Sequence, residues 1–524
     1  MAGMHSTKPH GAWMAPPGDY QDLIQELGQS DPRLRRPDKR WPRNGPVRVH
    51  VLEVPRPHPT GAIAPTPTIF YDADELGRYL QHGQNKDMTK NTIYILEGLN
   101  QSTIELMGSH FNLHPSIFLD YIRSAQVPSY RKGHSSMLAS SWATRNHLAM
   151  TYRELLGIDG DAANASNLRC ARTDRDIART RVNGSLDHVG ILHRRAVIWS
   201  RESGAQSEWD CIVICDPPAE TSTAGDGKRP DGYVDFVPVD VQASTRRGPP
   251  RTCLADDLVF YLTTHGNLVD NIASPDAITF FAKKIIASHY TQVFDYFRRN
   301  LREVQRFMRG PGPSDQTHLS AVEANWTDVQ FIERRLDKGR VDLEEILLQT
   351  GASLDPPNPE AVTSWKDVSA DFRLLYHRLI YLQQSAERIN ASITGLASIV
   401  GNRQAFREQQ LSLHAAEKAR GLTFIGLVFI PLAFVASLFS MSEPYGPGGD
   451  KFWLYFAISV PAGFVVMAAY YIFDLGFQPD GSGWSFSRFL EVCRSVTGYR
   501  QSQPPANATH SQRLDSEGFV MNIG

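Results

Sequence analysis

The chain has 524 residues, enough for two or three domains, and a formal net charge of −2. Its basic residues are interleaved with acidic ones, which excludes a basic nucleic-acid-binding surface, so we expect no nucleic-acid partner. Its five cysteines are scattered along the sequence, which favours a reducing compartment over a disulfide framework.

Residues 1–46 are rich in proline, arginine and glycine and show no apolar period, so we expect them to be disordered. Order is predicted to begin where Val47, Val49 and Val51 alternate with polar residues, as in a half-buried strand. We assign residues 47–253 to an α/β domain with loop insertions.

Within this domain, residues 92–96 resemble a strand and residues 101–124 helical segments. His114-Pro115 predicts a helix stop and restart, because proline suits a first helical turn. Residues 130–187 are rich in arginine, aspartate and asparagine, which predicts a long loop or insertion. Two later strand-like runs, 189–201 and 209–216, are expected to pair.

Three further features of the cytosolic region have simple structural interpretations. Cys211 and Cys215 lie in an apolar run and are interpreted as core residues rather than zinc ligands. Residues 217–251 are rich in proline, glycine and threonine and predict a disordered internal loop. The adjacent carboxylates Asp256 and Asp257 are interpreted as surface groups.

Residues 254–363 form the predicted helical part of the cytosolic domain, and residues 364–421 a stalk helix opened by a capping box at Ser364. The stalk contains a heptad-like seam. Its apolar positions are Leu375, Leu379, Leu382, Ala386, Ile389, Ile393, Leu396 and Val400. Such a seam suits a ring of parallel helices, a dimer, or a helix packed against neighbours in its own chain. We predict that copies of the chain associate through it.

Two apolar runs follow, residues 422–439 and 452–473, and neither contains a charged residue. At about 18 and about 22 residues, each is long enough to cross a hydrocarbon core of roughly 30 Å. We therefore predict a two-helix transmembrane domain over residues 422–473, with a tight hairpin connector, and a mostly disordered cytosolic tail over residues 474–524. The fold class is an α+β cytosolic domain followed by a long stalk helix and two C-terminal transmembrane helices.

Basic residues cluster before the first run and after the second. They are Arg403, Arg407, Lys418 and Arg420, then Arg488, Arg494 and Arg500. By the positive-inside rule, both termini are expected in the cytosol. The chain is thus expected to be a multi-pass integral membrane protein, in the plasma membrane rather than an organelle.

Phe429-Ile430-Pro431-Leu432, followed by Ser440-Met441-Ser442 and a second span, resembles the CorA-like divalent cation transporter superfamily. That family has two C-terminal spans and a Gly-Met-Asn signature, of which only Met441 is present here. The cytosolic domain shows a similar resemblance, over Ile104-Glu105-Leu106, the string Phe111-Asn112-Leu113-His114-Pro115 and Asp120.

The resemblance implies transport of divalent cations, and magnesium in particular, through a homo-oligomeric pore, with a pentamer expected. Helical spacing back from Ser440 places Leu422, Gly426, Ile430, Ala433 and Ser437 on one helix face. The family's arrangement implies that this face lines the pore. Plain packing of small residues between helices is the alternative. The expected entrance residues are Ser440, Met441, Ser442, Glu443 and Asp450. No dedicated metal ligands and no cofactor are assigned; the cation is cargo, and the other partner is the lipid bilayer.

A second hypothesis is a non-conducting, membrane-anchored scaffold or regulatory relative of the family. It rests on Ser442, which stands where the family has its ion-recruiting asparagine, and on Arg403 and Arg407 near the cytosolic entrance. Enzyme motifs are absent from the sequence, which contains no phosphate-binding glycine-rich loop, no H-E-x-x-H and no G-x-S-x-G. We expect no enzymatic activity.

Overall fold

The computed structural model describes most of the chain between Met14 and Gly476. The described residues are 14–30, 34, 45–55, 66–83, 90–122, 146–158, 168–170, 172–173, 175–181, 188–203, 208–219, 236–237, 248–266, 275–309, 316–358, 364–440, 450–476 and 490. The chain divides into two compact units, Met1–Val400 and Gly401–Gly524.

The first unit is built on an eight-stranded mixed sheet with the order β2-β1-β3-β8-β7-β6-β5, and β4 also pairs with β7. The strands are β1 (Arg48–Pro55), β2 (Pro67–Phe70), β3 (Lys90–Glu97), β4 (His147–Ile158), β5 (Leu168–Arg169), β6 (Asp176–Arg181), β7 (His188–Ser203) and β8 (Glu208–Cys215). Only β3 and β8 run parallel among these pairs. The predicted pairing of residues 189–201 with 209–216 is confirmed as β7 and β8.

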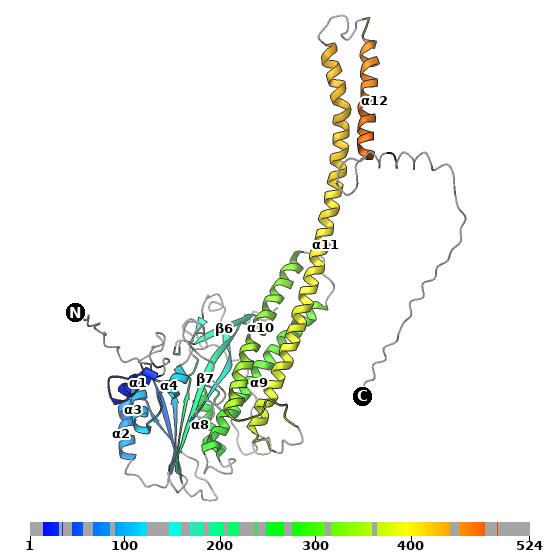
Figure 1. Cartoon of the computed structure of the whole chain (residues 1–524). Coiled ribbons are helices and arrows are strands. Elements are labelled where there is room, and N and C mark those ends of the chain that lie inside the picture. The colour runs from blue at the N-terminus through cyan, green and yellow to red at the C-terminus, as the bar shows by residue number, and fades with distance from the viewer. Residues whose placement is uncertain are drawn as a thin grey trace, which may run out of the picture. The chain divides into compact units, whose positions relative to one another are not determined.

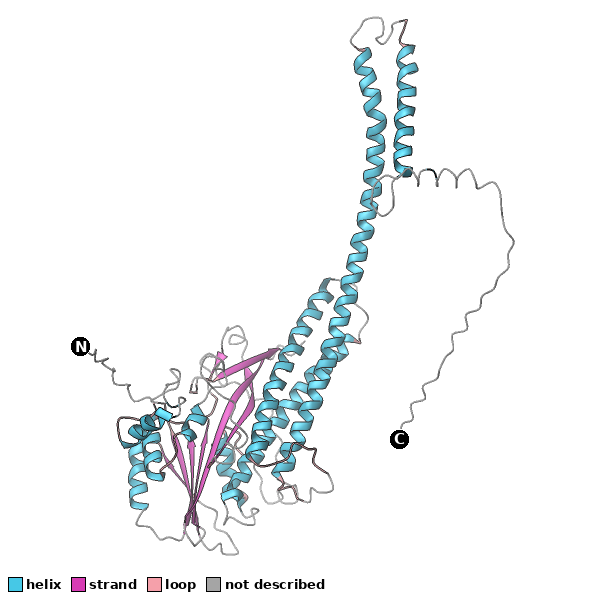
Figure 2. Cartoon of the chain, in the orientation of Figure 1, coloured by secondary structure: helices cyan, strands magenta, loops and turns pink. Residues whose placement is uncertain are grey.

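Helices cover both faces of the sheet (Figures 1 and 2). On one face lie α1 (Asp19–Ser30), α2 (Ala73–Gly83), α3 (Gln101–Phe111) and α4 (Ser116–Ile122). On the other lie α8 (Leu254–Thr264), α9 (Pro275–Met308), α10 (Gln316–Gln349) and the first part of α11 (Val368–Phe439). Alternate strand residues fill two separate cores, so Ile212 and Ile214 pack with the first helices, whereas Cys211 and Val213 pack with the second. The first unit is therefore a mixed α and β structure, and Cys211 and Cys215 are core residues as expected.

Two parts of the first unit differ from the expectation. Within residues 1–46, predicted disordered, α1 forms and buries Tyr20 and Ile24 against α3 and α4. Within residues 130–187, predicted as a loop, β4, β5 and β6 form. The charges of Arg153 and Glu154 hid the strand signal of β4, because both side chains are buried in ion pairs that the sequence does not reveal.

The turn at His114-Pro115 has the predicted stop and restart. Asn112 ends α3 in the left-handed conformation, with its N–H donating to Gly108 O, and α4 begins at Ser116. The exposed His114 ring contacts Ser116 Oγ at 2.8 Å, as in a local structural turn.

The stalk helix begins later than predicted. The Ser364 hydroxyl accepts a local bond from Lys366 N, whereas Asp367 Oδ1 accepts from Ala370 N at 2.9 Å and caps α11. The seam residues from Leu375 to Ile393 are buried in the core shared with α9 and α10. Of the three uses that the seam allows, this stretch packs against neighbours in its own chain.

The second unit contains the rest of α11 and α12 (Trp453–Gly476). In the part of the chain that the structure describes, Trp453–Ile472 is the one segment long and apolar enough to cross a membrane, and only 6% of its window is buried. The core helix of a soluble protein would be mostly covered. The apolar part of α11, Ile425–Phe439, is shorter. The connector at 441–449 and nearly all of the tail beyond Gly476 lie outside the described residues.

Candidate functional site

The residues predicted to line a pore lie along one stripe of α11. Leu422, Gly426, Ile430, Ala433 and Ser437 follow one another at intervals of three or four, which places them on one helix face. Leu422 and Ile430 are 73% and 71% exposed within the chain. A Cβ added to Gly426 would meet nothing within 4 Å. This stripe is therefore uncovered in a single chain.

The second apolar helix covers a different face of α11. Figure 1 shows α12 beside the end of α11, and the Phe439 and Tyr455 rings meet edge to face at 6.2 Å. Val435, one turn before Phe439, is the buried apolar residue of this segment. Val435 follows Gly426 by nine residues, which turns it about 180° around the helix. Thus α12 packs opposite the predicted pore stripe and leaves that stripe free.

The predicted entrance is described only at its two ends. Ser440 follows α11, with its N–H bonded to Ala436 O at 3.0 Å, and its side chain is exposed, as is Asp450. Met441, Ser442 and Glu443 lie outside the described residues. The entrance assignment therefore stays a prediction.

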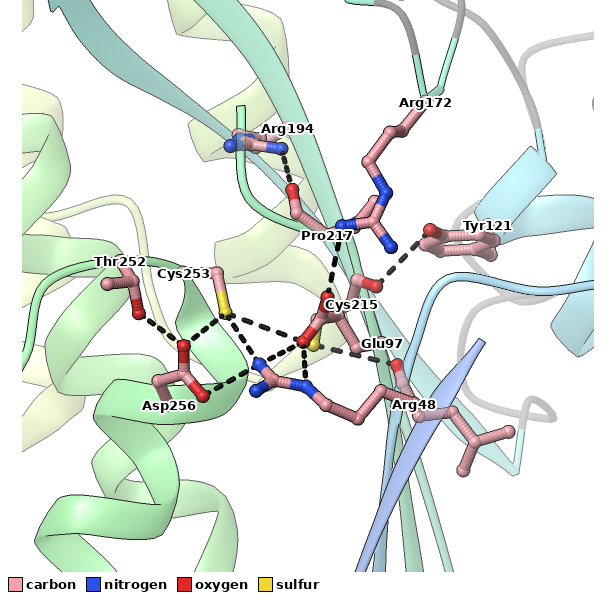
Figure 3. Close-up of polar contacts among 11 residues, drawn as sticks. Arg48, Glu97, Tyr121, Arg172, Arg194, Cys215, Pro217, Thr252, Cys253 and Asp256 are labelled. Carbon is pink, nitrogen blue, oxygen red and sulfur yellow. Dashed lines mark hydrogen bonds and ion pairs between the residues drawn. The ribbon is translucent and has the colours of Figure 1, made fainter. Parts of the chain in front are cut away.

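A second candidate site lies in the first unit, where β1, β3 and the start of α8 meet (Figure 3). The antiparallel register of β1 and β3 sets Arg48 opposite Glu97, and Arg48 Nε donates to Glu97 Oε2 at 2.6 Å. Arg48 Nη2 also reaches Asp256 Oδ1, in the first turn of α8, at 2.7 Å. Two carboxylates from separate elements thus share one guanidinium.

The start of α8 organises the other side of this cluster. Cys253 is the N-cap residue of α8, and its Sγ lies 3.4 Å from Asp256 Oδ2 and 3.8 Å from Glu97 Oε2. Burial opposes ionisation of Asp256, but the Thr252 hydroxyl and Arg48 outweigh it and hold the pKa of this carboxyl below its usual value. Asp256 is an anion in this site at neutral pH.

The interpretation of Asp256 and Asp257 as surface carboxylates is wrong. Asp257 is buried and accepts from Arg251 N, while Asp256 is half-buried in the ion pair with Arg48. Adjacent residues at a helix start point in different directions, so each finds a different partner. Arg48 and His50 share one face of β1. Two polar residues at this spacing in an apolar strand were the feature of the sequence that could have indicated a polar cluster here.

The first unit also contains buried ion pairs. Arg175 Nε is 2.9 Å from Asp216 Oδ2, and Arg194 Nε is 2.8 Å from Glu154 Oε2. Arg194 also donates to Pro217 O at 2.6 Å, where β7 passes from pairing with β6 to pairing with β8. These pairs join strands and loops of the sheet, so their role here is structural.

The acidic position Asp120, singled out by the family resemblance, is also structural here. Its Oδ2 lies 2.9 Å from His147 Nε2, and both side chains are 3% exposed. The pair joins α4 to the start of β4. Such a contact holds helix to sheet and offers no open coordination position.

No family model matches the chain, and no curated protein matches it. Among the solved structures similar to it are two that each have 11% identity and a TM-score of 0.30. One is the complete structure of the CorA magnesium transporter from Methanocaldococcus jannaschii, covering 83% of this chain and 98% of that one. The other is the full-length CmaX protein, covering 82% of this chain and 99% of that one. A likeness at this level does not decide the function of this chain.

Proposed function

We propose that this chain is a membrane transporter of divalent cations, with magnesium as the cargo, whose oligomeric pore is lined by the last part of α11. The observation that carries the proposal is the free stripe of α11 opposite α12. Two helices cannot enclose a polar path by themselves, because lipid would reach it. An uncovered stripe of small and apolar residues at the end of a long helix suits closure by further copies of the same helix.

The chemistry of the stripe indicates how a cation would pass. Leu422, Gly426, Ile430 and Ala433 offer no ligand oxygen from their side chains, and Ser437 offers one hydroxyl. Such a lining cannot replace the water shell of a bare ion, so it would pass a hydrated cation or gate by dewetting. Magnesium fits, because it gives up its waters reluctantly.

Self-association is part of the proposal, and we expect a homopentamer. Ile399, Phe406 and Leu413 recur at intervals of seven along α11, and their exposed fractions within one chain are 51%, 66% and 60%. A seven-residue apolar repeat is the pattern of helices that pack against other helices. We therefore move the expected contact between copies from residues 375–400 to this later stretch.

The test is magnesium uptake into liposomes that contain the purified protein. Gly426→Trp should abolish uptake, because the indole would project into the proposed axis. Gly463→Trp, in α12, is the matched control, since a Cβ at either glycine meets nothing within 4 Å in the chain. Uptake blocked by the α12 variant but not by the α11 variant would reject the assignment of the pore to α11.

Two spans with both termini in the cytosol complete the proposal, and we place the protein in the plasma membrane. A cysteine introduced at Gly448, in the connector, should react with an impermeant thiol reagent on intact cells. A cysteine in the tail at Gly498 should react only after permeabilisation. The reverse pattern would overturn the topology.

The scaffold remains the second candidate, and Ser442 favours it, because its side chain is shorter than the asparagine amide of the family signature. A serine hydroxyl can still bond a metal-bound water. If a verified ring assembly takes up no magnesium above empty liposomes, the transport proposal fails and the non-conducting scaffold is favoured.

A further inference from the structure

Three side chains from three elements converge at the cluster described above. His50 on β1, Glu97 on β3 and Asp256 on α8 each offer one ligand atom, and these atoms all lie within 4.8 Å of one another. Glu97 is 2% and His50 3% exposed. Such groups are costly to bury without a compensating contact.

His50 lacks that contact. Among the described residues, neither its Nδ1 nor its Nε2 has a hydrogen-bond partner. Burial, with Arg48 nearby, lowers the pKa of His50 to about 4, against a smaller opposite effect of Asp256. The imidazole is therefore neutral at physiological pH, and a ring nitrogen lone pair is free to bind a metal. A buried imidazole with both nitrogens unpaired requires an explanation.

Cys253 adds a sulfur donor beside the two carboxylates. In a tetrahedral zinc site with sulfur at about 2.3 Å and oxygen at about 2.1 Å, the sulfur and oxygen ligands lie about 3.6 Å apart. The thiol of Cys253 lies 3.4 Å from Asp256 Oδ2 and 3.8 Å from Glu97 Oε2. Both separations are within about 0.2 Å of the tetrahedral value. The distances from the Cys253 sulfur to the two carboxylates therefore match those of a tetrahedral site.

We propose that His50, Glu97, Cys253 and Asp256 form a site for a borderline-soft divalent metal, of which zinc is the type. A nitrogen, a sulfur and two carboxylate oxygens are the donors that zinc takes, whereas magnesium prefers oxygen and water alone. The site lies within the first unit and does not depend on the proposed transport function.

Arg48 is the internal competitor of the metal. Its guanidinium contacts both Glu97 and Asp256, and its side chain is 24% exposed, so it can turn toward solvent when a metal takes its place. Arg172 Nη1 lies 3.6 Å from Glu97 Oε1 and remains as a nearby cation. Two carboxylates and a thiolate around a divalent ion leave one negative charge, which Arg172 or the displaced Arg48 can balance.

Binding must also release a proton. Burial, together with Glu97 and Asp256, raises the pKa of Cys253 to about 12, so the free site holds a thiol. Metal binding forms a metal–sulfur bond and breaks the S–H bond, and the proton passes to the solvent. Because His50 is already neutral, we expect about one proton released per metal bound, with none in a Cys253→Ser variant.

The test uses full-length protein in detergent, with excess magnesium to occupy sites that accept oxygen ligands alone. Zinc titration by calorimetry in buffers of different ionisation enthalpy gives the affinity, stoichiometry and proton count. Cobalt absorption reports thiolate ligation. We expect one metal per chain, and His50→Gln should weaken binding by more than about 100-fold, the largest loss typical of a group outside the ligand set. Cys170→Ser, at another buried cysteine, is the matched control and should bind as wild type.

Arg48→Met separates loss of the site from loss of the fold. Removing the competing guanidinium should strengthen zinc binding, and a misfolded variant could not bind more tightly. Arg201→Met, at the exposed pair with Asp210, should leave affinity unchanged. Zinc binding that is unaffected by His50→Gln, or that is not strengthened by Arg48→Met, would overturn the proposal. Neither result depends on whether the protein transports magnesium.

Discussion

The two stretches of α11 make the most informative contrast in the molecule. From Leu375 to Ile393 the apolar positions are buried against α9 and α10. From Phe406 to Leu438 the large apolar side chains are mostly exposed within the chain. Both stretches belong to one uninterrupted helix of 72 residues. Helical propensity alone therefore does not distinguish them; their surroundings do.

Polar contacts follow the same division. In the buried stretch, Gln383 donates to Asp337 at 2.7 Å, and Asn390 donates to Glu333 at 3.3 Å, both on α10. In the exposed stretch, the described bonds are local, such as Gln404 to Glu408 along the same helix. The first stretch bonds its polar groups to α10, whereas the second bonds them along its own helix. Variants in both stretches of α11 test this contrast, and two further experiments test buried charged groups of the first unit.

The largest expected effect is loss of the first unit. Replacing Ile389 and Ile393 together with Asp places two unpaired charges in the core with α9 and α10, at a cost of more than about 5 kcal/mol. We expect the first unit to unfold, seen as loss of the near-ultraviolet circular dichroism signal and rapid proteolysis. A protein that stays folded and changes only its oligomeric state would instead support the prediction that these residues join copies of the chain.

The next effect concerns the buried ion pairs of the first unit. Asp216→Ala leaves Arg175 buried without its carboxylate partner and should lower the free energy of unfolding by about 3–5 kcal/mol. Arg201→Ala, at the exposed pair with Asp210, should cost less than about 1 kcal/mol. Denaturant unfolding of both variants measures the difference. Equal losses would mean that burial does not set the strength of these pairs.

A smaller effect is expected on acidification. The pKa of His50 is about 4 in the folded chain and 6.5 unfolded, so the unfolded chain takes up a proton that the folded chain refuses. Wild type should therefore lose stability as pH falls from 6.5 toward 4, by about 2 kcal/mol between about pH 7 and about pH 5. His50→Gln should lack this component of the pH dependence. Urea unfolding with a chelator present checks it, and parallel curves for the two proteins would contradict it.

The smallest effect on stability is expected where α11 is exposed. Phe406 and Leu413 are largely exposed within the chain, so replacing both with Asp should change the unfolding free energy of the first unit by less than about 0.5 kcal/mol. The mass of the assembly in detergent should nevertheless fall, because the proposed contact between copies acquires like charges. An unchanged mass would show that this stretch does not join copies.

Local sequence patterns predicted those elements that depend on residues close together in the sequence. The alternation of Val47, Val49 and Val51 identified β1, and His114-Pro115 identified the break between α3 and α4. The strand β4 was missed, because its charges are balanced by Asp342 on α10 and Arg194 on β7. Partners that lie far apart in the sequence cannot be identified from a single segment.

The sequence by itself determined the long helix, the apolar segments near its end and the apolar stripe on α11, since each depends on periodicity and the absence of charge over neighbouring residues. Only the tertiary structure decided that the seam at Leu375–Ile393 belongs to the chain's own core. It alone brought His50, Glu97, Cys253 and Asp256 together from two strands and a helix start. Sheet register and helix packing set such distances, and neither is encoded within one stretch of sequence.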